Sequence, residues 1–589
     1  MVALALTCTG PGPTAADGER AHALSGRALE NLVAFTRLLG YVRFFDPSDS
    51  AAVADWDQFT IASVDDVEDA RSPDELAAAL RRLFTPLSPA IRLGTHPVAI
   101  DTLALRAGGS PTGVLTWMHH GWAPMSLDTT VYWSRRDRHG AHADGLRPGP
   151  GRSITADLGG GVWCAVPTSL WFDHAGTLPR ARNVRRRPAE RSAGLVPSGD
   201  DRSTRLADVA LCWTVIQHFF PYFDVVHADW DAALRDALQS AAVDSGAEDL
   251  GVTLERMMAH LDDGHAGVWG PGNGERFYNP ASFVWRWVEG RLVVTAVVDS
   301  ARTLLRPGDE VLTVNGEPTE RRYEALARRI SSATEGFRRF KSLGMMSESA
   351  DTLALEVQGA DGTRRKAVFQ ASRMGPSSWR TSGWTRYPGR PAPIARLRPG
   401  IWYVDVARTT DSTFTAMVDT LADARGLIFD VRGYPYHLGT EPLAHLTDTT
   451  LTSGQWHVPI VTAPDHRDMA FDFSNWTVAP KSPRFRGRIA FLIDGRAISY
   501  AETWLGIAEH HRLGALVGEP TAGTNGNVNF ISLPGGYRVT YTGMKVLKQD
   551  GSRHQGIGIR PTVPVSPTLA GIRAGRDEQL EKAIEVVGG

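Results

Sequence analysis

Two stretches of helical pattern in the first half of the chain resemble each other. Residues 38–45 read LLGYVRFF and residues 213–220 read WTVIQHFF, and an Ala-Asp-Trp-Asp segment follows each of them, beginning at Ala54 and at Ala228. At the same offset of 174 residues, apolar positions with i, i+4 and i+7 spacing recur as Leu76, Leu80 and Leu83 and as Leu250, Leu254 and Met257. This spacing predicts that each copy ends in an amphipathic helix. The constant offset predicts an internal duplication.

The two copies differ directly after this helix. The second copy continues as Leu-Asp-Asp-Gly-His over residues 261–265, whereas the first continues as Leu-Ser-Pro-Ala-Ile over residues 87–91. His265 therefore stands opposite Ile91, and the helical scaffold itself does not require a histidine there. We interpret the first copy as structural and the second as the one that has acquired a titratable group.

Three further segments follow from local patterning. Residues 92–176 alternate polar and apolar positions with frequent Gly and Pro, which predicts short strands. Residues 177–203 are polar and rich in arginine, and they are interpreted as a solvated linker rather than a nucleic-acid patch because no aromatic residues are interleaved. Residues 281–370 are expected to form a separate β-unit, because a strand reading GRLVVTAVV is followed by the hairpin signal Asn315-Gly316.

The last 190 or so residues alternate apolar strands with helical segments. Strands are predicted at Gly426–Val431 and Arg488–Ile493, and a helix at Ala501–His511. This alternation predicts a mostly parallel α/β core, in which reacting groups lie at the carboxyl ends of the strands. Ser499 follows the second strand and precedes the helix, so that the N–H groups opening the helix, Tyr500 first, are placed to receive an oxyanion.

Composition narrows the range of functions. The chain has 589 residues, 42% of them hydrophobic, 22% charged, and a formal net charge of −2, which gives no positive field for nucleic acid or an anionic membrane. No apolar run is long enough to span a bilayer. The three cysteines are scattered, and His119 and His120 lack a third ligand at sensible spacing, so we expect no metal and no cofactor. A cytoplasmic location is expected, with export through the short apolar stretch ending at Cys8 as the alternative.

Several motifs in order carry a family resemblance over about residues 204–589. They are the helical segment ending in DDGHA, the Pro-Gly-Asp and Val-Asn-Gly run of residues 307–316, GIWYVDVAR, GLIFDVRGYP, AISYAET, VGEPTAGTNGNV and GIGIRPTVPV. This part of the chain resembles the serine peptidase family of the C-terminal processing (tail-specific) proteases and the tricorn core protease. The resemblance implies a multidomain α+β chain with a ClpP/crotonase-like α/β catalytic core, a PDZ-like β-domain that captures chain ends by strand addition, and helical segments.

The resemblance also implies a catalytic set. Ser499 matches the nucleophile. Thr524 stands where the tail-specific branch has its lysine, and a threonine cannot act as a base near neutral pH, so the Ser/Lys pair is absent. His265 matches the histidine of the tricorn-like branch, and a neutral imidazole suits proton abstraction from a serine. Gln555 stands at the position of that branch's glutamate; a glutamine can orient the imidazole but cannot stabilise the imidazolium by charge.

The oxyanion region departs from the family pattern as well. Two family glycines are replaced by Tyr436 and His437. The N–H groups of Tyr500 and Tyr436 are the expected oxyanion donors, and Gly433 and His437 are expected to contact substrate. Glu502 in the same motif is interpreted as a helix-start residue favoured by the helix dipole rather than as a catalytic acid.

These observations predict a serine peptidase that cleaves flexible polypeptides through an acyl-enzyme. Two alternatives remain: hydrolysis of a small-molecule ester, lactone or amide, and a non-catalytic binding protein on the same scaffold. The expected parts are a disordered tail at 1–25, a helical and β domain at 26–176, a linker at 177–203, a helical domain carrying His265 at 204–280, the PDZ-like domain at 281–370, a linker at 371–397 and the catalytic core at 398–589.

Overall fold

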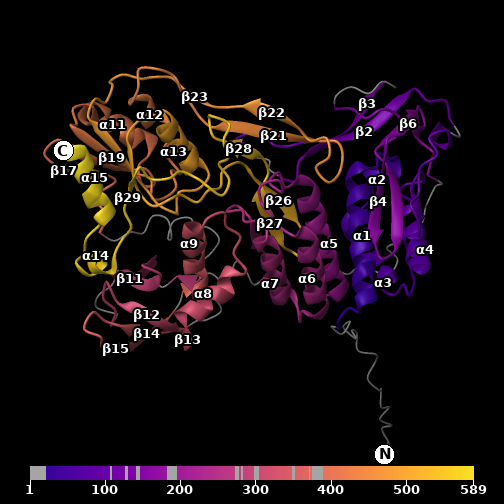
Figure 1. Cartoon of the computed structure of the whole chain (residues 1–589), viewed down its shortest axis with the longest axis horizontal. Helices are drawn as coiled ribbons and strands as arrows, with labels where there is room; N and C mark the ends of the chain where they lie inside the picture. Colours follow the sequence, from indigo (N-terminus) through magenta and orange to yellow (C-terminus); the bar gives the residue numbers. More distant parts are fainter. Residues whose placement is uncertain are drawn as a thin grey trace, which may run out of the picture.

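The structure of the chain is a computed structural model (Figure 1), and a parallel-sheet core and the first helical copy lie at its opposite ends. It describes residues 22–106, 109–126, 130–140, 146–181, 196–271, 278–279, 283–297, 304–347, 352–370, 372–373 and 389–589. Most of the predicted tail, much of the arginine-rich linker and most of the predicted linker before the core lie outside these residues. No helix in the described ranges is long and apolar enough to cross a membrane.

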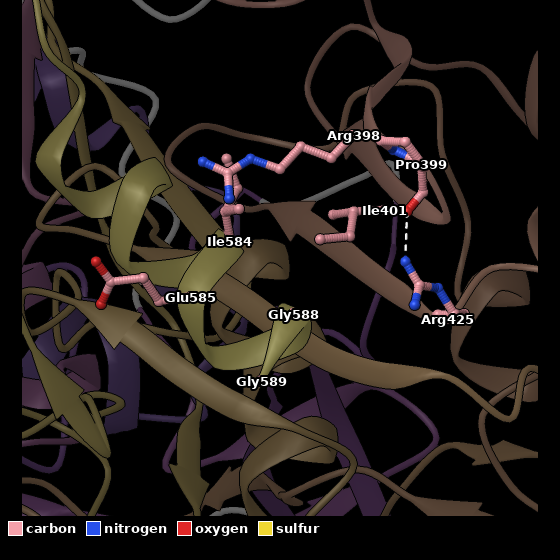
Figure 2. Close-up of a pocket in the computed structure, with 8 residues that line it drawn as sticks. All are labelled: Arg398, Pro399, Ile401, Arg425, Ile584, Glu585, Gly588 and Gly589. Carbon is pink, nitrogen blue, oxygen red and sulfur yellow. Dashed lines mark hydrogen bonds between the residues drawn. The ribbon is translucent and has the colours of Figure 1, made fainter.

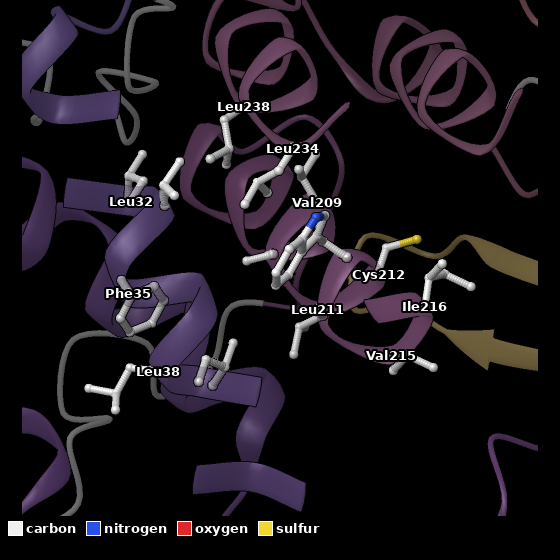
Figure 3. Close-up of a cluster of buried hydrophobic side chains, with 14 of the residues drawn as sticks. Leu32, Phe35, Leu38, Val209, Leu211, Cys212, Val215, Ile216, Leu234 and Leu238 are labelled. Carbon is white, nitrogen blue, oxygen red and sulfur yellow. The ribbon is translucent and has the colours of Figure 1, made fainter. Parts of the chain in front are cut away.

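The helices of the two copies begin at matching positions. The last helix of the first copy starts at Pro73 and the last helix of the second copy starts at Ala247, which is 174 residues later. The first copy holds α1 (Gly26–Phe45), α2 (Asp49–Ala52), α3 (Trp56–Glu68) and α4 (Pro73–Phe84), and the second holds α5 (Arg202–Phe219), α6 (Trp230–Val243) and α7 (Ala247–Ala259). Their apolar faces form one shared core, in which Leu32, Phe35 and Leu38 of α1 pack with residues of α5 and α6 (Figure 3).

Each copy continues into a three-stranded antiparallel sheet. The first sheet has the order β1 (Arg92–Gly94), β5 (Val162–Pro167), β4 (Ser153–Gly159), and the second has the order β8 (Gly267–Trp269), β27 (Arg538–Thr542), β26 (Val528–Ser532). In the first copy the hairpin comes from the same domain, whereas in the second it comes from the C-terminal part of the chain. The second copy is therefore completed by the core.

A seven-stranded sheet joins the N-terminal region to the core. The two contributions meet where His119 and His120 of β2 pair with Val461 and Ile460 of β21. Its strands are β2 (Gly113–His120), β3 (Trp133–His139), β6 (Ser169–Asp173), β7 (Gly176–Leu178), β21 (Gln455–Val461), β22 (Ala470–Ser474) and β28 (Lys545–Leu547). The His119 ring bonds Ser134 Oγ and the Phe44 carbonyl. In the described ranges no group of three or more His, Cys, Asp or Glu could hold a metal.

Residues 283–370 form a β-unit with two helices. Its antiparallel sheet has the order β10 (Phe283–Val288), β11 (Arg291–Val297), β12 (Glu310–Val314), β14 (Thr352–Gln358), β15 (Arg364–Gln370), with β13 (Glu317–Pro318) beside β12. The helices are α8 (Thr319–Ala327) and α9 (Glu335–Met345). The unit has an apolar core of its own, and α9 extends toward the centre of the molecule (Figure 1).

The C-terminal core is the predicted α/β layer structure. Its sheet has the order β17 (Ile394–Arg398), β18 (Ile401–Asp405), β19 (Gly426–Asp430), β24 (Arg488–Ile493), β25 (Ala515–Gly518), β29 (Val563–Pro564). All neighbours are parallel except β17 and β18. The apolar cluster on one face includes α11 (Asp411–Ala422) and α13 (Tyr500–His510), and α15 (Glu578–Gly588) covers the other.

Shorter elements connect these parts. They are η1 (Ala104–Arg106), β9 (Tyr278–Asn279), β16 (Ser372–Arg373), α12 (Glu441–Ala444), β20 (Leu451–Thr452), β23 (Thr477–Val478) and α14 (Leu569–Arg573). The molecule is thus a multidomain α+β chain, as predicted from the sequence. The predicted helix Ala501–His511 is α13, one residue earlier at each end, and β17 starts the core four residues before the expected boundary.

Candidate active site

Ser499 occupies a turn that lies between β24 and α13. Its backbone has φ 58° and ψ −120°, a conformation that L-residues rarely adopt. The turn is held because the Ser499 N–H donates to the Thr524 carbonyl at 2.9 Å, and its carbonyl accepts from Glu502 N–H at 2.8 Å. The preceding residues are fixed by Asp494, whose carboxylate accepts from the Arg496 N–H at 3.0 Å. A strained serine at a strand-to-helix junction is the geometry of an exposed nucleophile.

The backbone donors near Ser499 differ from one another. Tyr500 is the first residue of α13, so its N–H has no acceptor within the helix and points toward the space before the helix start. The Tyr436 N–H, the other expected oxyanion donor, instead donates to the Tyr434 carbonyl at 3.0 Å. In this structure that N–H is therefore already engaged.

His265 is held by a chain of hydrogen bonds that sequence reasoning did not identify. Its Nδ1 lies 2.9 Å from Thr542 Oγ1, and Thr542 Oγ1 donates to Asp263 Oδ1 at 2.6 Å. Since the hydroxyl has one proton and gives it to the carboxylate, it accepts from Nδ1–H of the ring. The Thr542 N–H donates to Asp263 Oδ2 at 2.7 Å and fixes the carboxylate. The proton on Nδ1 leaves the lone pair on Nε2, which is the tautomer that a general base requires.

The strand register of the second copy places Thr542 beside His265. In the second copy Gly267 of β8 pairs with Thr540 of β27, so extending the register by two residues puts His265 opposite Thr542. In the first copy Arg92 pairs with Ala165, which puts Ile91 opposite Val166. Ile91 and Val166 are both buried in the apolar core. One copy therefore has an apolar pair where the other has His265 and Thr542.

The surroundings of His265 favour its neutral form. Burial lowers the pKa of His265 below its ordinary value, the Asp263 carboxylate opposes this, and the Lys341 ammonium adds to it; the more distant Glu502 raises the pKa. Nε2 of His265 is buried and has no hydrogen-bond partner among the described residues, and Ser499 Oγ is therefore not bonded to it. The hydrogen bond between Ser499 and His265 therefore has to form when substrate binds. In ligand-free structures the hydrogen bonds of catalytic pairs are commonly long or absent.

Gln555 does not occupy the orienting position that the resemblance implied. Its side chain is buried, its Nε2 donates to the Asp262 carbonyl at 3.2 Å, and its Oε1 has no partner among the described residues. The ring nitrogen that it was expected to hold is bonded to Thr542 instead. Asp263 supplies the negative charge that a glutamine lacks.

Thr524, at the lysine position, links the serine and histidine segments. Its carbonyl accepts from Ser499, and its Oγ1 accepts from the Gly264 N–H at 2.9 Å. A Cβ on Gly264 would lie 2.8 Å from Thr524 Oγ1 and 2.9 Å from Ile498 Cδ1. The absence of a side chain at residue 264 is therefore what lets the two segments meet.

Glu502 is more than a helix-start residue. Its carboxylate is buried and accepts from Gly523 N–H at 2.7 Å, from Thr524 N–H at 2.8 Å and from the Thr521 hydroxyl. It also lies 3.1 Å from His554 Nε2. Glu502 thereby fixes the loop of residues 521–524, on which the Ser499 backbone depends.

The two residues expected to bind substrate lie in different environments. Gly433 is buried, whereas His437 is exposed, and the His437 carbonyl accepts from the Asp411 N–H at 2.9 Å. Tyr434 packs against the small apolar cluster that includes Ile498, and its ring lies 4.7 Å from the Tyr436 ring and 6.4 Å from the Tyr500 ring, centroid to centroid. An aromatic wall therefore stands beside Ser499.

A separate hollow of about 450 Å³ lies at the opposite end of the sheet strands (Figure 2). Arg398 at the end of β17 and Arg425 directly before β19 line it, and the end of α15 closes one side. Ser499 follows the carboxyl end of β24, so this hollow is not part of the active site.

Comparisons with known proteins show a family match and similar folds. Residues 400–565 match the family model of peptidase family S41. No curated protein matches the chain. Mature CPAF complexed with lactacystin is 15% identical with a TM-score of 0.53, and the match covers 65% of this chain and 97% of that one. For the photosystem II D1 C-terminal processing protease the values are 16%, 0.38, 66% and 98%. For the tricorn protease they are 14%, 0.32, 65% and 36%.

At these identities the likeness to CPAF concerns the fold, and the family match covers the region that holds Ser499 and Thr542. A serine in a nucleophile turn and the family match to its domain point to the same chemistry. Residues 400–565 match peptidase family S41, and the chain is a serine-type peptidase.

Proposed function

We propose that the chain hydrolyses polypeptides through an acyl-enzyme on Ser499, with His265 as general base and Thr542 and Asp263 as the residues that orient the ring. Nε2 of His265 takes the Ser499 proton as Oγ attacks the scissile carbonyl, and then gives it to the leaving amine. Water attacks the acyl-enzyme in the second half-reaction, with the same nitrogen as base.

The observation that carries this proposal is the hydrogen-bond chain from His265 Nδ1 through Thr542 to Asp263. It fixes the tautomer, leaves Nε2 as the basic nitrogen, and places a carboxylate one hydroxyl away from the developing imidazolium. In this buried site the attraction between the carboxylate and the charged ring is stronger than it would be between the same groups in water. The Tyr500 N–H is the proposed first oxyanion donor.

For the architecture, we propose that the core is of the ClpP/crotonase type and that residues 281–370 are PDZ-like. Support comes from the layered parallel sheet and from the small antiparallel unit with two helices. Within the described residues, β10 and β15 each pair on one side only, so this unit has sheet edges to which an extended chain end can add as a strand. The histidine at the end of the helical copy supports placement in the tricorn-like branch.

One observation favours a narrower substrate. The Tyr436 N–H is already bonded. The aromatic wall of Tyr434, Tyr436 and Tyr500 also leaves less room for substrate than paired glycines would. Hydrolysis of a small ester, lactone or amide is therefore the second candidate. A binding protein on the same scaffold would show no covalent chemistry at all.

A fluorophosphonate probe separates these functions. Peptidase and esterase both predict labelling of Ser499 in the wild type and none in Ser499→Ala, whereas a binding protein predicts neither. Turnover of an unstructured polypeptide, compared with an activated ester of similar size, then decides between the two enzymes. Lactacystin, with which CPAF forms a complex, serves as a second ligand: competition with the probe supports a shared site.

A further inference from the structure

Lys341 of α9 is buried against the segment that carries His265. Its Nζ donates to the Gly264 carbonyl at 3.1 Å, to the Ala266 carbonyl at 3.0 Å and to the Ser331 carbonyl at 2.9 Å. Two of these carbonyls belong to the residues immediately before and after His265. A protonated amine has three N–H donors and all three are used, so an uncharged amine, with two donors and a lone pair, would leave one carbonyl without a partner.

The same helix contacts the other two active-site loops. A Cβ on Gly495, in the turn before Ser499, would lie 2.7 Å from the Gly336 backbone, so the two backbones touch there. Phe337 packs with Ile498 and Ala522 in a small apolar cluster.

The residues just before α9 complete these contacts. Thr334 Oγ1 lies 3.2 Å from the Thr521 carbonyl and 3.1 Å from the Ala522 carbonyl, and Ser331 Oγ accepts from the Asp263 N–H at 2.9 Å. The serine, histidine and 521–524 segments therefore all rest on residues 331–341 of the β-unit.

We propose that Lys341 is a positioning residue for the reaction: it holds the His265 segment in place against α9, and it thereby couples the β-unit to catalysis. This inference rests on the proposed role of His265 as base. Its geometry does not depend on the substrate, because Lys341 Nζ donates to backbone carbonyls of the histidine segment and of Ser331.

The charges around both groups act in defined directions. Asp263 and Glu502 raise the pKa of His265, whereas burial and Lys341 lower it. Burial lowers the pKa of Lys341 to about 8, Asp263 and Glu255 oppose the shift, and Arg338 adds to it. Loss of the Lys341 charge is therefore expected to raise the pKa of His265, and a merely structural lysine would leave that pKa unmoved.

The test compares Lys341→Met with Arg321→Met, which removes a positive charge from an exposed position on α8 of the same unit. We expect kcat of Lys341→Met to fall roughly 10- to 100-fold with little change in KM, as for a misplaced catalytic group. The acid limb of kcat/KM should move to higher pH, and the imidazole signal of His265, assigned with His265→Ala, should titrate at higher pH. Arg321→Met should match the wild type in all three.

An unshifted His265 titration in folded Lys341→Met, or wild-type kcat, would overturn the inference. Lys341→Gln keeps two N–H donors without the charge, so it should retain more of kcat than Lys341→Met while showing the same shift. If neither variant folds, the wild type decides: kcat should fall as Lys341 loses its proton above about pH 8, and a flat profile to pH 10 contradicts the proposal. Failure of the proposed function appears separately, as a wild type that no serine probe labels, and leaves the titration readout usable.

Discussion

Thr542 stands opposite His265 across the junction of β8 and β27, with its hydroxyl 2.9 Å from the imidazole Nδ1. The two residues come from segments more than 270 positions apart, one from the second helical copy and one from the C-terminal core. Completion of the second copy by a core hairpin is thus what assembles the base with its orienting group.

Thr542→Val removes this group while keeping its shape. The first copy has Val166 at the equivalent position, so the strand should tolerate the change. We expect kcat to fall on the order of 10²- to 10⁴-fold, because the ring loses the acceptor that fixes its tautomer. The matched control is Val166→Thr, which places an unpaired hydroxyl in the core: it should lower stability by about 1–3 kcal/mol and leave kcat unchanged. Steady-state kinetics and urea unfolding measure both effects.

Asp263→Asn tests the charge behind the hydroxyl. The Asp263 carboxylate raises the pKa of His265, so its removal lowers that pKa and lets the ring stay neutral to lower pH. The acid limb of kcat/KM is therefore expected to move to lower pH, opposite to the shift expected for Lys341→Met. At the same time kcat should fall, because the imidazolium formed during attack loses its stabilising charge. A wild-type pH profile with wild-type kcat would remove Asp263 from the mechanism.

The backbone of Ser499 predicts a trade between stability and activity. A glycine adopts the φ of 58° without strain, whereas an alanine is strained there. Ser499→Gly and Ser499→Ala should both be inactive, and Ser499→Gly should be more stable than Ser499→Ala by about 1 kcal/mol in chemical unfolding. Equal stability of the two variants would mean that the turn carries no such strain in solution.

Thr524 is expected to act through its hydroxyl position and not as a base. Thr524→Ser keeps the acceptor for the Gly264 N–H, whereas Thr524→Val removes it without changing the shape. We expect near wild-type kcat for the serine variant and a loss of about tenfold or more for the valine variant, since the His265 segment loses an anchor. If both variants match the wild type, the bridge to Gly264 does not matter for catalysis.

The features that depend on local pattern could be predicted from the sequence. The parallel core, Ser499 before a helix, and the contrast between His265 and Ile91 could all be read from periodicity, spacing and family motifs. The position of Gln555 could not, because a motif aligned along the chain does not say which side chain reaches the ring: Gln555 turned out to bond the Asp262 carbonyl.

Thr542 and Lys341 were out of reach for a related reason. A threonine on a strand and a lysine on an amphipathic helix look ordinary in sequence, and their roles come from contacts made across domains. The duplication gave no indication of Thr542, because the first copy has Val166 at the equivalent position and the second copy takes its hairpin from the core. This pairing of strands is visible only in the structure.

The most direct test of the account is the rate of fluorophosphonate labelling in wild type, His265→Ala and Thr542→Val, measured as a function of pH, with the labelled peptide identified by mass. A Ser499–His265 pair predicts a single label on Ser499, a rate that rises with pH as an imidazole with a pKa below its ordinary value loses its proton, and a loss of most of that rate in both variants. Labelling of a different serine, or equal rates in all three proteins, would contradict the assignment of Ser499 and His265 as nucleophile and base.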